Sequence, residues 1–418
     1  MLTSNGNEEA RMYEREANGR GEGVMATGRR GRWYWLAVLV AVASVALALP
    51  GESMARVKVP QASKGPIKMA GPGSVAWITV HAGSGEVLAS QDPDRPGAPA
   101  SMTKMMLALL VAEAVRDGQL KLTDPVTASA LASKMGGSQV YLKQGEAFSV
   151  EELMAALLIG SANDAAVALA ERVAGTVEGA VVRMNDRAKQ LGMDRTRYAS
   201  VHGLPPGPGQ EGDATTPRDV ARLALELVKF PEILKWTGTK EAPFRGGAFT
   251  LQNSNHLVGN VPGVDGLKTG HFHEAGYNVA ATARRGGLRV VTVVMGAPTN
   301  KDRFAQAARL LEEAFAQYVE VTVVKGNTPL SPEVRLPRAG GPFKPMVSQD
   351  VRLLVKRAER DAIKTSVEIT PGLRAPVKRG APVGNLVARV GDREVARAPL
   401  VAPIDVGRSL FWWLTPWK

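Results

Sequence analysis

Ser101 and Lys104 are the first residues in the sequence whose types and spacing suggest covalent chemistry. They stand three positions apart at the start of a stretch of helix-forming residues, so a helix would place both side chains on one face. A serine hydroxyl is a weak nucleophile until a base removes its proton, and lysine becomes such a base when burial or a second cation lowers its pKa. The pattern alone is weak, because a capping serine followed by a solvated lysine has the same spacing.

Two later segments add groups that such a nucleophile would need. Ser161-Ala162-Asn163 follows a predicted helix at residues 150–160, and Lys268-Thr269-Gly270-His271 leads into a predicted hairpin. The three segments together, in this order and in these settings, are far less expected by coincidence than any one of them alone.

The composition excludes several other chemistries. The chain has no cysteine, which excludes disulfides, thiolate nucleophiles and cysteine-ligated metal sites. His271 and His273, with Glu274, are a conceivable metal site, but a third ligand at a useful spacing is missing, so we expect neither a metal nor an organic cofactor. The net charge of +12 favours an anionic partner, while the chain has no motif that would form an aromatic and basic platform for nucleic acid.

The pattern of apolar residues predicts an α/β (α+β) catalytic domain over residues 70–318. Strands are expected in two hairpins, at 74–80 with 85–90 and at 277–283 with 288–296. Helices are expected between and after them, at 102–116, 150–160, 218–229 and 301–319, with Ser149 and Glu152 forming a capping box. This order indicates one mixed sheet flanked by helices.

After residue 318 the sequence changes to β-branched stretches interrupted by proline, which predicts a small all-β domain over residues 319–405. Residues 319–418 contain 17 Lys and Arg against 9 Asp and Glu, a net charge of +8, so most of the excess charge belongs here. Residues 406–418 hold three tryptophans and a phenylalanine, which suit an amphipathic tail at a membrane interface. The alternative is that this tail packs on its own domain.

The N-terminal residues 1–55 are typical of an extension followed by a signal peptide. Arg29, Arg30 and Arg32 precede the uncharged run 33–49, and small residues then allow cleavage after Ala55. An uncleaved N-terminal anchor is the alternative, and both readings predict export. Residues 56–69 would be a linker to the catalytic domain.

The three segments resemble those of the penicilloyl serine transferases, the penicillin-binding proteins and serine β-lactamases. Within that superfamily, the chain over about residues 70–318 is similar to the low-molecular-weight D-alanyl-D-alanine carboxypeptidases. The matching motifs, in the family's order, are Ala100–Lys104, Ser161–Ala165, Leu191–Met193, His202–Leu204, Asp265–His271 and Ala275–Tyr277. A C-terminal β domain with an amphipathic tail also matches the family plan.

The resemblance implies a role for each group of the first two segments. Ser101 would attack the carbonyl between two D-alanines and form an acyl-enzyme that water hydrolyses, and Lys104 would accept its proton. Ser161 would relay a proton to the leaving amine, and Asn163 would hold Lys104 and the substrate amide.

It also implies how the third segment binds the substrate. Lys268 and Thr269 would meet the terminal carboxylate, Lys268 would lower the pKa of Lys104, and Gly270 would let the substrate backbone approach. The backbone N–H groups of Ser101 and His271 would form the oxyanion hole. Arg303 falls where the family often has an arginine near the carboxylate pocket, or is a surface charge on its helix.

The expected substrates are pentapeptide stems of peptidoglycan, with β-lactams as covalent inhibitors, at the outer face of the cytoplasmic membrane or in the periplasm. Ala162, Phe272 and His273 differ from the residues usual in the family and are expected to change pocket width and so substrate preference. The alternatives are a serine β-lactamase, for which Glu211 would be the additional glutamate, and a non-catalytic scaffold that binds the cell wall.

Overall fold

The structure is a computed structural model of the full chain, and it describes residue 73 and residues 75–409. The predicted signal peptide and residues 410–418 of the predicted tail lie outside these residues. Within the described part of the chain, every helix is too short or too polar to cross a membrane.

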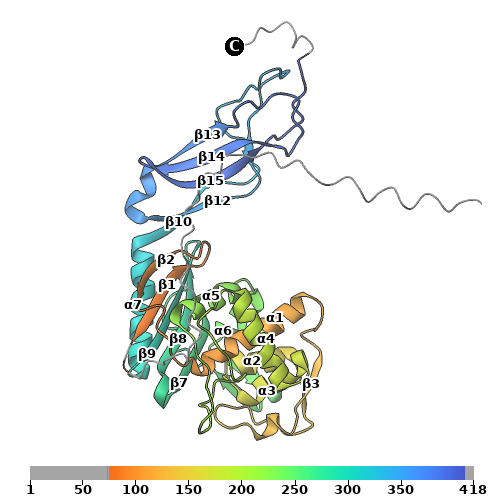
Figure 1. Cartoon of the computed structure of the whole chain (residues 1–418), viewed down its shortest axis with the longest axis vertical. Helices are drawn as coiled ribbons and strands as arrows, with labels where there is room; N and C mark the ends of the chain where they lie inside the picture. Colours follow the sequence, from red (N-terminus) through yellow and green to blue (C-terminus); the bar gives the residue numbers. More distant parts are fainter. Residues whose placement is uncertain (1–72, 74, 410–418) are drawn as a thin grey trace, which may run out of the picture. The chain divides into compact units, whose positions relative to one another are not determined.

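A five-stranded sheet forms the centre of the catalytic domain, in the order β2-β1-β9-β8-β7 (Figure 1). The strands are β1 Ala76–His81, β2 Val87–Gln91, β7 Val264–Phe272, β8 Gly276–Arg285 and β9 Leu288–Ala297. Both predicted hairpins are present, and β7 lies at one edge. The sheet was expected to be mixed, but every pairing is antiparallel, because hairpins join its neighbours and β1 runs opposite to β9.

Helices cover both faces of this sheet (Figure 1). One face is covered by a group of helices that pack in one core cluster: α1 Lys104–Arg116, α2 Val150–Leu158, α3 Asn163–Ala174, α4 Val177–Gln190, α5 Pro217–Leu227 and α6 Pro231–Thr237. On the opposite face, α7 Asn300–Gln317 packs on β8 and β9. The predicted capping box of Ser149 and Glu152 is confirmed, and the side chains of Thr216 and Thr299 cap α5 and α7.

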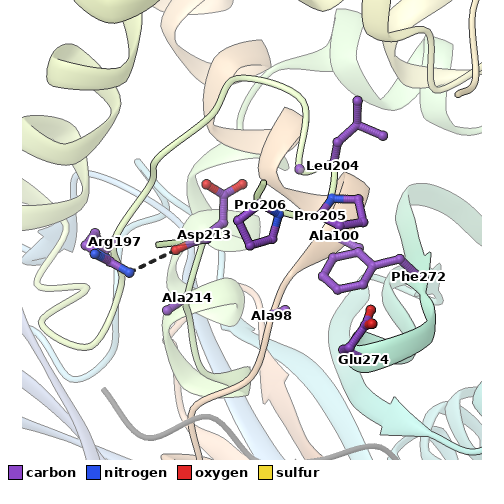
Figure 2. Close-up of a pocket in the computed structure, with 12 residues that line it drawn as sticks. Ala98, Ala100, Arg197, Leu204, Pro205, Pro206, Asp213, Ala214, Phe272 and Glu274 are labelled. Atoms are coloured by element: carbon purple, nitrogen blue, oxygen red, sulfur yellow. Dashed lines mark hydrogen bonds between the residues drawn. The ribbon is translucent and has the colours of Figure 1, made fainter. Parts of the chain in front are cut away.

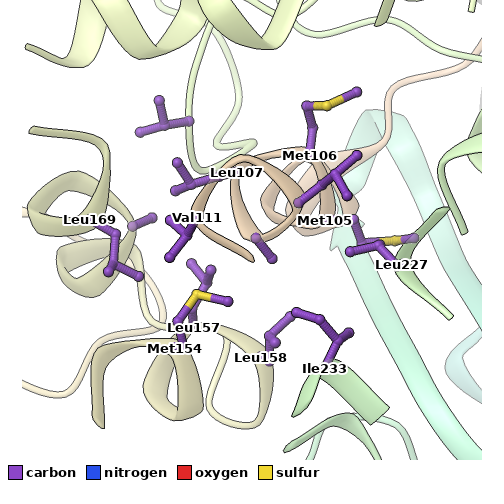
Figure 3. Packing of buried hydrophobic residues seen from close by; sticks show 14 of the residues in the cluster. Met105, Met106, Leu107, Val111, Met154, Leu157, Leu158, Leu169, Leu227 and Ile233 are labelled. Carbon is purple, nitrogen blue, oxygen red and sulfur yellow. The ribbon is translucent and has the colours of Figure 1, made fainter. Parts of the chain in front are cut away.

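The helix that carries the candidate base is surrounded by other elements of the domain (Figure 3). Met105, Met106 and Leu107 of α1 are fully buried, and they belong to one cluster with side chains from α2, α3, α5 and α6. Burial on all sides holds α1 rigidly, because interior side chains pack at crystal-like density. The start of α1 is therefore a well-fixed platform for a catalytic side chain.

Two short ribbons lie outside the sheet. Strands β3 Pro125–Thr127 and β4 Ala147–Ser149 form one, and β5 Glu241–Phe244 and β6 Phe249–Gln252 form the other. We did not predict them, nor α3, α4 and α6, since their short or mixed patterns carry little periodic signal.

The C-terminal domain consists of strands with one 3₁₀ segment, Arg357–Ala362. Strands β10 Tyr318–Val324 and β12 Val351–Lys356 pair, and a second sheet has the order β11-β15-β14-β13, with β11 Met346–Val347, β13 Ile363–Ile369, β14 Pro382–Val390 and β15 Arg393–Val401. The change from helix to strand falls between Gln317 and Tyr318, one residue before the expected boundary. Val406 is buried in the domain's core, so the first residues of the predicted tail belong to this domain.

Candidate active site

Ser101 lies in a 3₁₀ turn, Ala100–Thr103, that continues directly into α1. Strand β7 and the turn at Gly203 both pack closely against the backbone just before this serine. A Cβ on Gly270 would collide with the Pro99 carbonyl, and a Cβ on Gly203 would collide with the Ala100 carbonyl. Gly270 was expected to admit the substrate backbone, but the structure shows that its missing side chain first makes room for the nucleophile's own segment.

Lys104, the first residue of α1, is fully buried. Its Nζ lies 3.0 Å from Ser101 Oγ and donates a hydrogen bond of 2.6 Å to the carbonyl of His202. The helical spacing therefore brings hydroxyl and amine together as expected. The His202 carbonyl was missed as a partner, although His202–Leu204 is one of the motifs that carry the resemblance.

The surroundings of Lys104 favour its neutral form. Burial, and then the positive charge of Lys268, place the pKa of Lys104 well below its ordinary value, while the carboxylates of Asp213 and Asp164 oppose this shift. Lys268 is itself buried, and burial together with the charge of Arg303 lowers its pKa to about 7. An amine with a lowered pKa can accept the proton of the neighbouring hydroxyl near neutral pH.

The second segment lies at the start of α3. Ser161 is buried and has a φ of 60°, in the left-handed region, and Asn163 is the first residue of the helix. The Asn163 amide nitrogen donates to the Gly136 carbonyl at 2.6 Å, and its Oδ1 is buried without a hydrogen-bond partner in the described chain. The expected contact between Asn163 and Lys104 is not formed in this structure.

The third segment runs along β7, the edge strand. Lys268 is 1% exposed and its Nζ donates to the carbonyl of Thr269 at 3.2 Å. The hydroxyl of Thr269 lies 2.6 Å from that of Ser254. Sequence reasoning missed Ser254, although three consecutive polar residues, Asn253-Ser254-Asn255, follow directly after β6. The hydroxyl and the amine of this strand, with the Ser254 hydroxyl from the segment after β6, suit the binding of a carboxylate.

His271 and Arg303 differ in their exposure to solvent: the first is exposed and the second is buried. The His271 ring is exposed and stacks on Tyr277 with 3.8 Å between centroids. Arg303 is only 6% exposed, and it donates to the carbonyls of Gly270 and Asn278, which joins β7 to β8. Its guanidinium is a buried group rather than a surface charge, and burial lowers its pKa to about 10.

A cavity of about 350 Å³ lies beside the nucleophile's turn (Figure 2). Figure 2 shows Phe272 and Glu274 on one side and Pro205 and Pro206 close by. The Pro- and Gly-rich loop of residues 204–212 therefore forms a wall of this cavity. Its Glu211 is largely exposed and pairs with Arg197, so the structure does not aim it at an acyl group on Ser101.

Among the residues that the structure describes, no group of three or more His, Cys, Asp or Glu side chains is placed to hold a metal ion. His271 stacks on Tyr277 instead, and the conceivable site at His271 and His273 is not assembled.

Comparison with known proteins places this geometry in a family. The D-alanyl-D-alanine carboxypeptidase family matches residues 68–299, and the C-terminal domain of penicillin-binding protein 5 matches residues 343–408. The chain is 36% identical over 339 residues to the D-alanyl-D-alanine carboxypeptidase DacF of Bacillus subtilis, covering 80% of this chain and 86% of the relative. It is 33% identical over 346 residues to DacC of Escherichia coli, covering 81% and 85%.

Solved structures agree with this assignment. Penicillin-binding protein 5 of Haemophilus influenzae superposes with a TM-score of 0.68 at 29% identity, covering 83% of this chain and all of that one. Penicillin-binding protein D2 of Listeria monocytogenes, solved in its ampicillin-bound form, has a TM-score of 0.53 at 32% identity and covers 60% of this chain. The chain thus belongs to the family of serine D-alanyl-D-alanine carboxypeptidases among the penicillin-binding proteins, and has that family's activity.

Proposed function

We propose that Ser101 is the nucleophile of this carboxypeptidase and that Lys104 is its general base. The neutral amine takes the hydroxyl proton as Ser101 Oγ attacks the carbonyl between the two D-alanines. The new C–O bond gives a tetrahedral oxyanion, which the backbone N–H groups of Ser101 and His271 stabilise. The 3.0 Å separation of Lys104 Nζ and Ser101 Oγ, with an amine whose pKa is lowered, is the observation that carries this proposal.

Collapse of the oxyanion breaks the peptide C–N bond. The departing amine of D-alanine takes a proton, which Ser161 relays from Lys104, and the acyl group remains on Ser101 as an ester. Water then attacks this ester, Lys104 accepts the water proton, and Ser101 regains its own. Asn163 holds the substrate amide through its Oδ1, which has no partner in the described chain.

The substrate binds as an extended peptide along the edge of β7. Its terminal carboxylate meets Lys268 Nζ and the hydroxyl of Thr269. Arg303 holds the Gly270 carbonyl by a hydrogen bond, and its positive charge helps to lower the pKa of Lys268. The acyl part of the peptide then passes His271 and reaches the cavity beside Phe272. No metal or organic cofactor enters these steps.

The substrate class we propose is the pentapeptide stem of peptidoglycan, with penicillins as covalent inhibitors. A relative solved with ampicillin supports the second part. Mass spectrometry of a defined pentapeptide muropeptide should show the loss of one alanine residue, and Ser101→Ala should abolish both this loss and labelling by fluorescent penicillin. Persistence of either in Ser101→Ala would contradict the assignment of the nucleophile.

We further propose that the protein is exported by its N-terminal signal peptide and attached to the membrane surface by its C-terminal tail. The apolar run 33–49 and the aromatic residues after position 409 support this, and both lie outside the described residues. Because Val406 packs in the domain core, the deletion that tests the tail should begin at Leu410. It should move the protein to the soluble fraction without loss of turnover, and retention at the membrane would show that the tail is not the anchor.

A further inference from the structure

Asp213 is a buried carboxylate that the mechanism above does not use. It is 7% exposed, and it lies in an extended segment whose neighbour Ala214 pairs by backbone hydrogen bonds with Arg197. Both of its oxygens are engaged by donors from other parts of the chain. A buried carboxylate with this many short hydrogen bonds is held in one place, because moving it would leave several polar groups unpaired.

One donor to Asp213 comes from the nucleophile's own turn. The hydroxyl of Thr103, the residue before Lys104, donates to Asp213 Oδ2 at 2.6 Å. Thr103 is fully buried and stands between the nucleophile and the base in the sequence. The carboxylate therefore holds the start of α1 at the position where its two reacting side chains are set.

The other donors come from the loop that holds the base. Asp213 Oδ1 accepts from the N–H groups of Ala199 and Ser200 at 2.7 and 2.9 Å, and Oδ2 accepts from the Ser200 hydroxyl at 3.0 Å. The Ser200 hydroxyl in turn accepts from the N–H of Gly203 at 2.8 Å. The residue before this glycine, His202, supplies the carbonyl that binds the amine of Lys104.

We propose that Asp213 is a positioning residue, which ties the turn of the nucleophile to the loop of the His202 carbonyl and so sets the distance between Lys104 Nζ and Ser101 Oγ. The inference rests on the proposed roles of Ser101 and Lys104. Small misplacements of reacting groups have large kinetic effects, so a loosened link slows acylation even when the substrate still binds. Lys268 and Thr269, which bind the carboxylate, are not part of the link.

Asp213 also acts on Lys104 through its charge. The ionisable groups around the amine are Lys268, Asp213, Asp164 and the His202 ring; Lys268 lowers the pKa of Lys104 and the two carboxylates raise it. Removing the charge of Asp213 therefore lowers the pKa of Lys104 further. The acidic limb of a pH–rate profile should then move to lower pH, a change that a purely structural defect does not produce.

Three variants separate these effects. Thr103→Val removes one donor and leaves the charge of Asp213, so acylation by fluorescent penicillin should slow about tenfold with the acidic limb unmoved. Asp213→Asn should slow acylation roughly 100-fold and move the acidic limb to lower pH. In both, the dissociation constant of penicillin before acylation should match that of the wild type.

Asp219→Asn is the matched control. Asp219 is another buried carboxylate, which accepts from the N–H of Arg195 and the hydroxyl of Thr196 and does not touch the nucleophile's turn. It should leave the acylation rate and the acidic limb at their wild-type positions.

The inference is overturned if Thr103→Val acylates at the wild-type rate, if Asp219→Asn slows acylation as much as Asp213→Asn, or if the loss appears as weaker binding. If Asp213→Asn does not fold, the acylation rate of Thr103→Val still tests the proposed link. Failure of the proposed function looks different, because it shows in the wild-type protein as missing label, or as label that survives Ser101→Ala.

Discussion

The catalytic cleft and the C-terminal domain use basic residues in opposite ways. Lys104 and Lys268 are almost completely buried, and no carboxylate lies within salt-bridge distance of either among the described residues. In the C-terminal domain, Arg389 of β14 and Arg397 of β15 are partly exposed and form salt bridges of 2.9 to 3.0 Å with Glu368 of β13. The first arrangement favours the neutral form of each amine, and the second favours the charged forms and keeps them in contact with water.

The difference shows what each arrangement does for the protein. A buried amine with no carboxylate partner costs stability, because its charged form loses hydration, and the same cost makes it a base. An exposed pair is screened by solvent and contributes little to either stability or chemistry. Arg389 and Arg397 are thus of the second kind, and Lys104 and Lys268 are of the first.

The largest effect is expected from Lys104→Met. Release of D-alanine and acylation by penicillin should fall roughly 1000-fold, since the proposed general base is lost. The melting temperature should rise, because a buried amine is replaced by an apolar side chain of similar length.

The pH dependence of this gain has a definite sign. Folded Lys104 has a lowered pKa and binds its proton less readily than the unfolded chain, so wild-type stability falls as the pH falls from the lysine's ordinary pKa toward its lowered one. The difference in melting temperature should widen in that direction. Lys364→Met, at an exposed position of β13, is the control; equal melting temperatures for the Lys104 variant and the wild type would contradict the cost of burial.

A second, smaller effect is expected from Lys268→Met. The value of kcat/KM for a D-Ala-D-Ala peptide should fall roughly 100-fold, as for the loss of a charge-assisted hydrogen bond to the carboxylate. Because Lys268 lowers the pKa of Lys104, its removal should also move the acidic limb of kcat/KM to higher pH.

The wild-type profile is the reference for that variant. Its kcat/KM should decline as the pH rises through about 7, where Lys268 loses its proton and the carboxylate loses its cation. An unchanged acidic limb in Lys268→Met would show that the two lysines are not coupled.

In the C-terminal domain, Leu386→Ala should affect stability alone. Leu386 of β14 is buried in the core of that domain, and its truncation should cost about 3 kcal/mol of unfolding free energy. Thermal unfolding followed by circular dichroism measures this, while kcat/KM for the peptide should match the wild type. A loss of acylation in the folded variant would show that the two regions are not independent in catalysis.

The smallest effect is expected from Glu368→Gln, which removes the carboxylate shared by Arg389 and Arg397. Activity and melting temperature should both stay at the wild-type values, because exposed pairs are screened by water and salt. A clear drop in melting temperature that disappears in 0.5 M salt, about a 4 Å screening length, would show that this network stabilises the sheet.

Local patterns predicted much of the fold. The two hairpins, the helices that carry strong caps and the change to strands near residue 318 all follow from alternation, capping residues and proline positions within short windows. The ribbons of β3 with β4 and β5 with β6 did not, since strands of three or four residues are stabilised by their partners rather than by their own pattern.

For the candidate active site, short segments and their resemblance to a family were enough to predict the hydroxyl, the amine and the strand that we propose binds the carboxylate, because motifs are properties of short segments. Folding alone decided that Arg303 is buried behind β7 and that Asp213 binds Thr103, 110 positions away. It also decided how far the pKa of each lysine falls. Burial and distance depend on the whole packed chain, and no local pattern carries them.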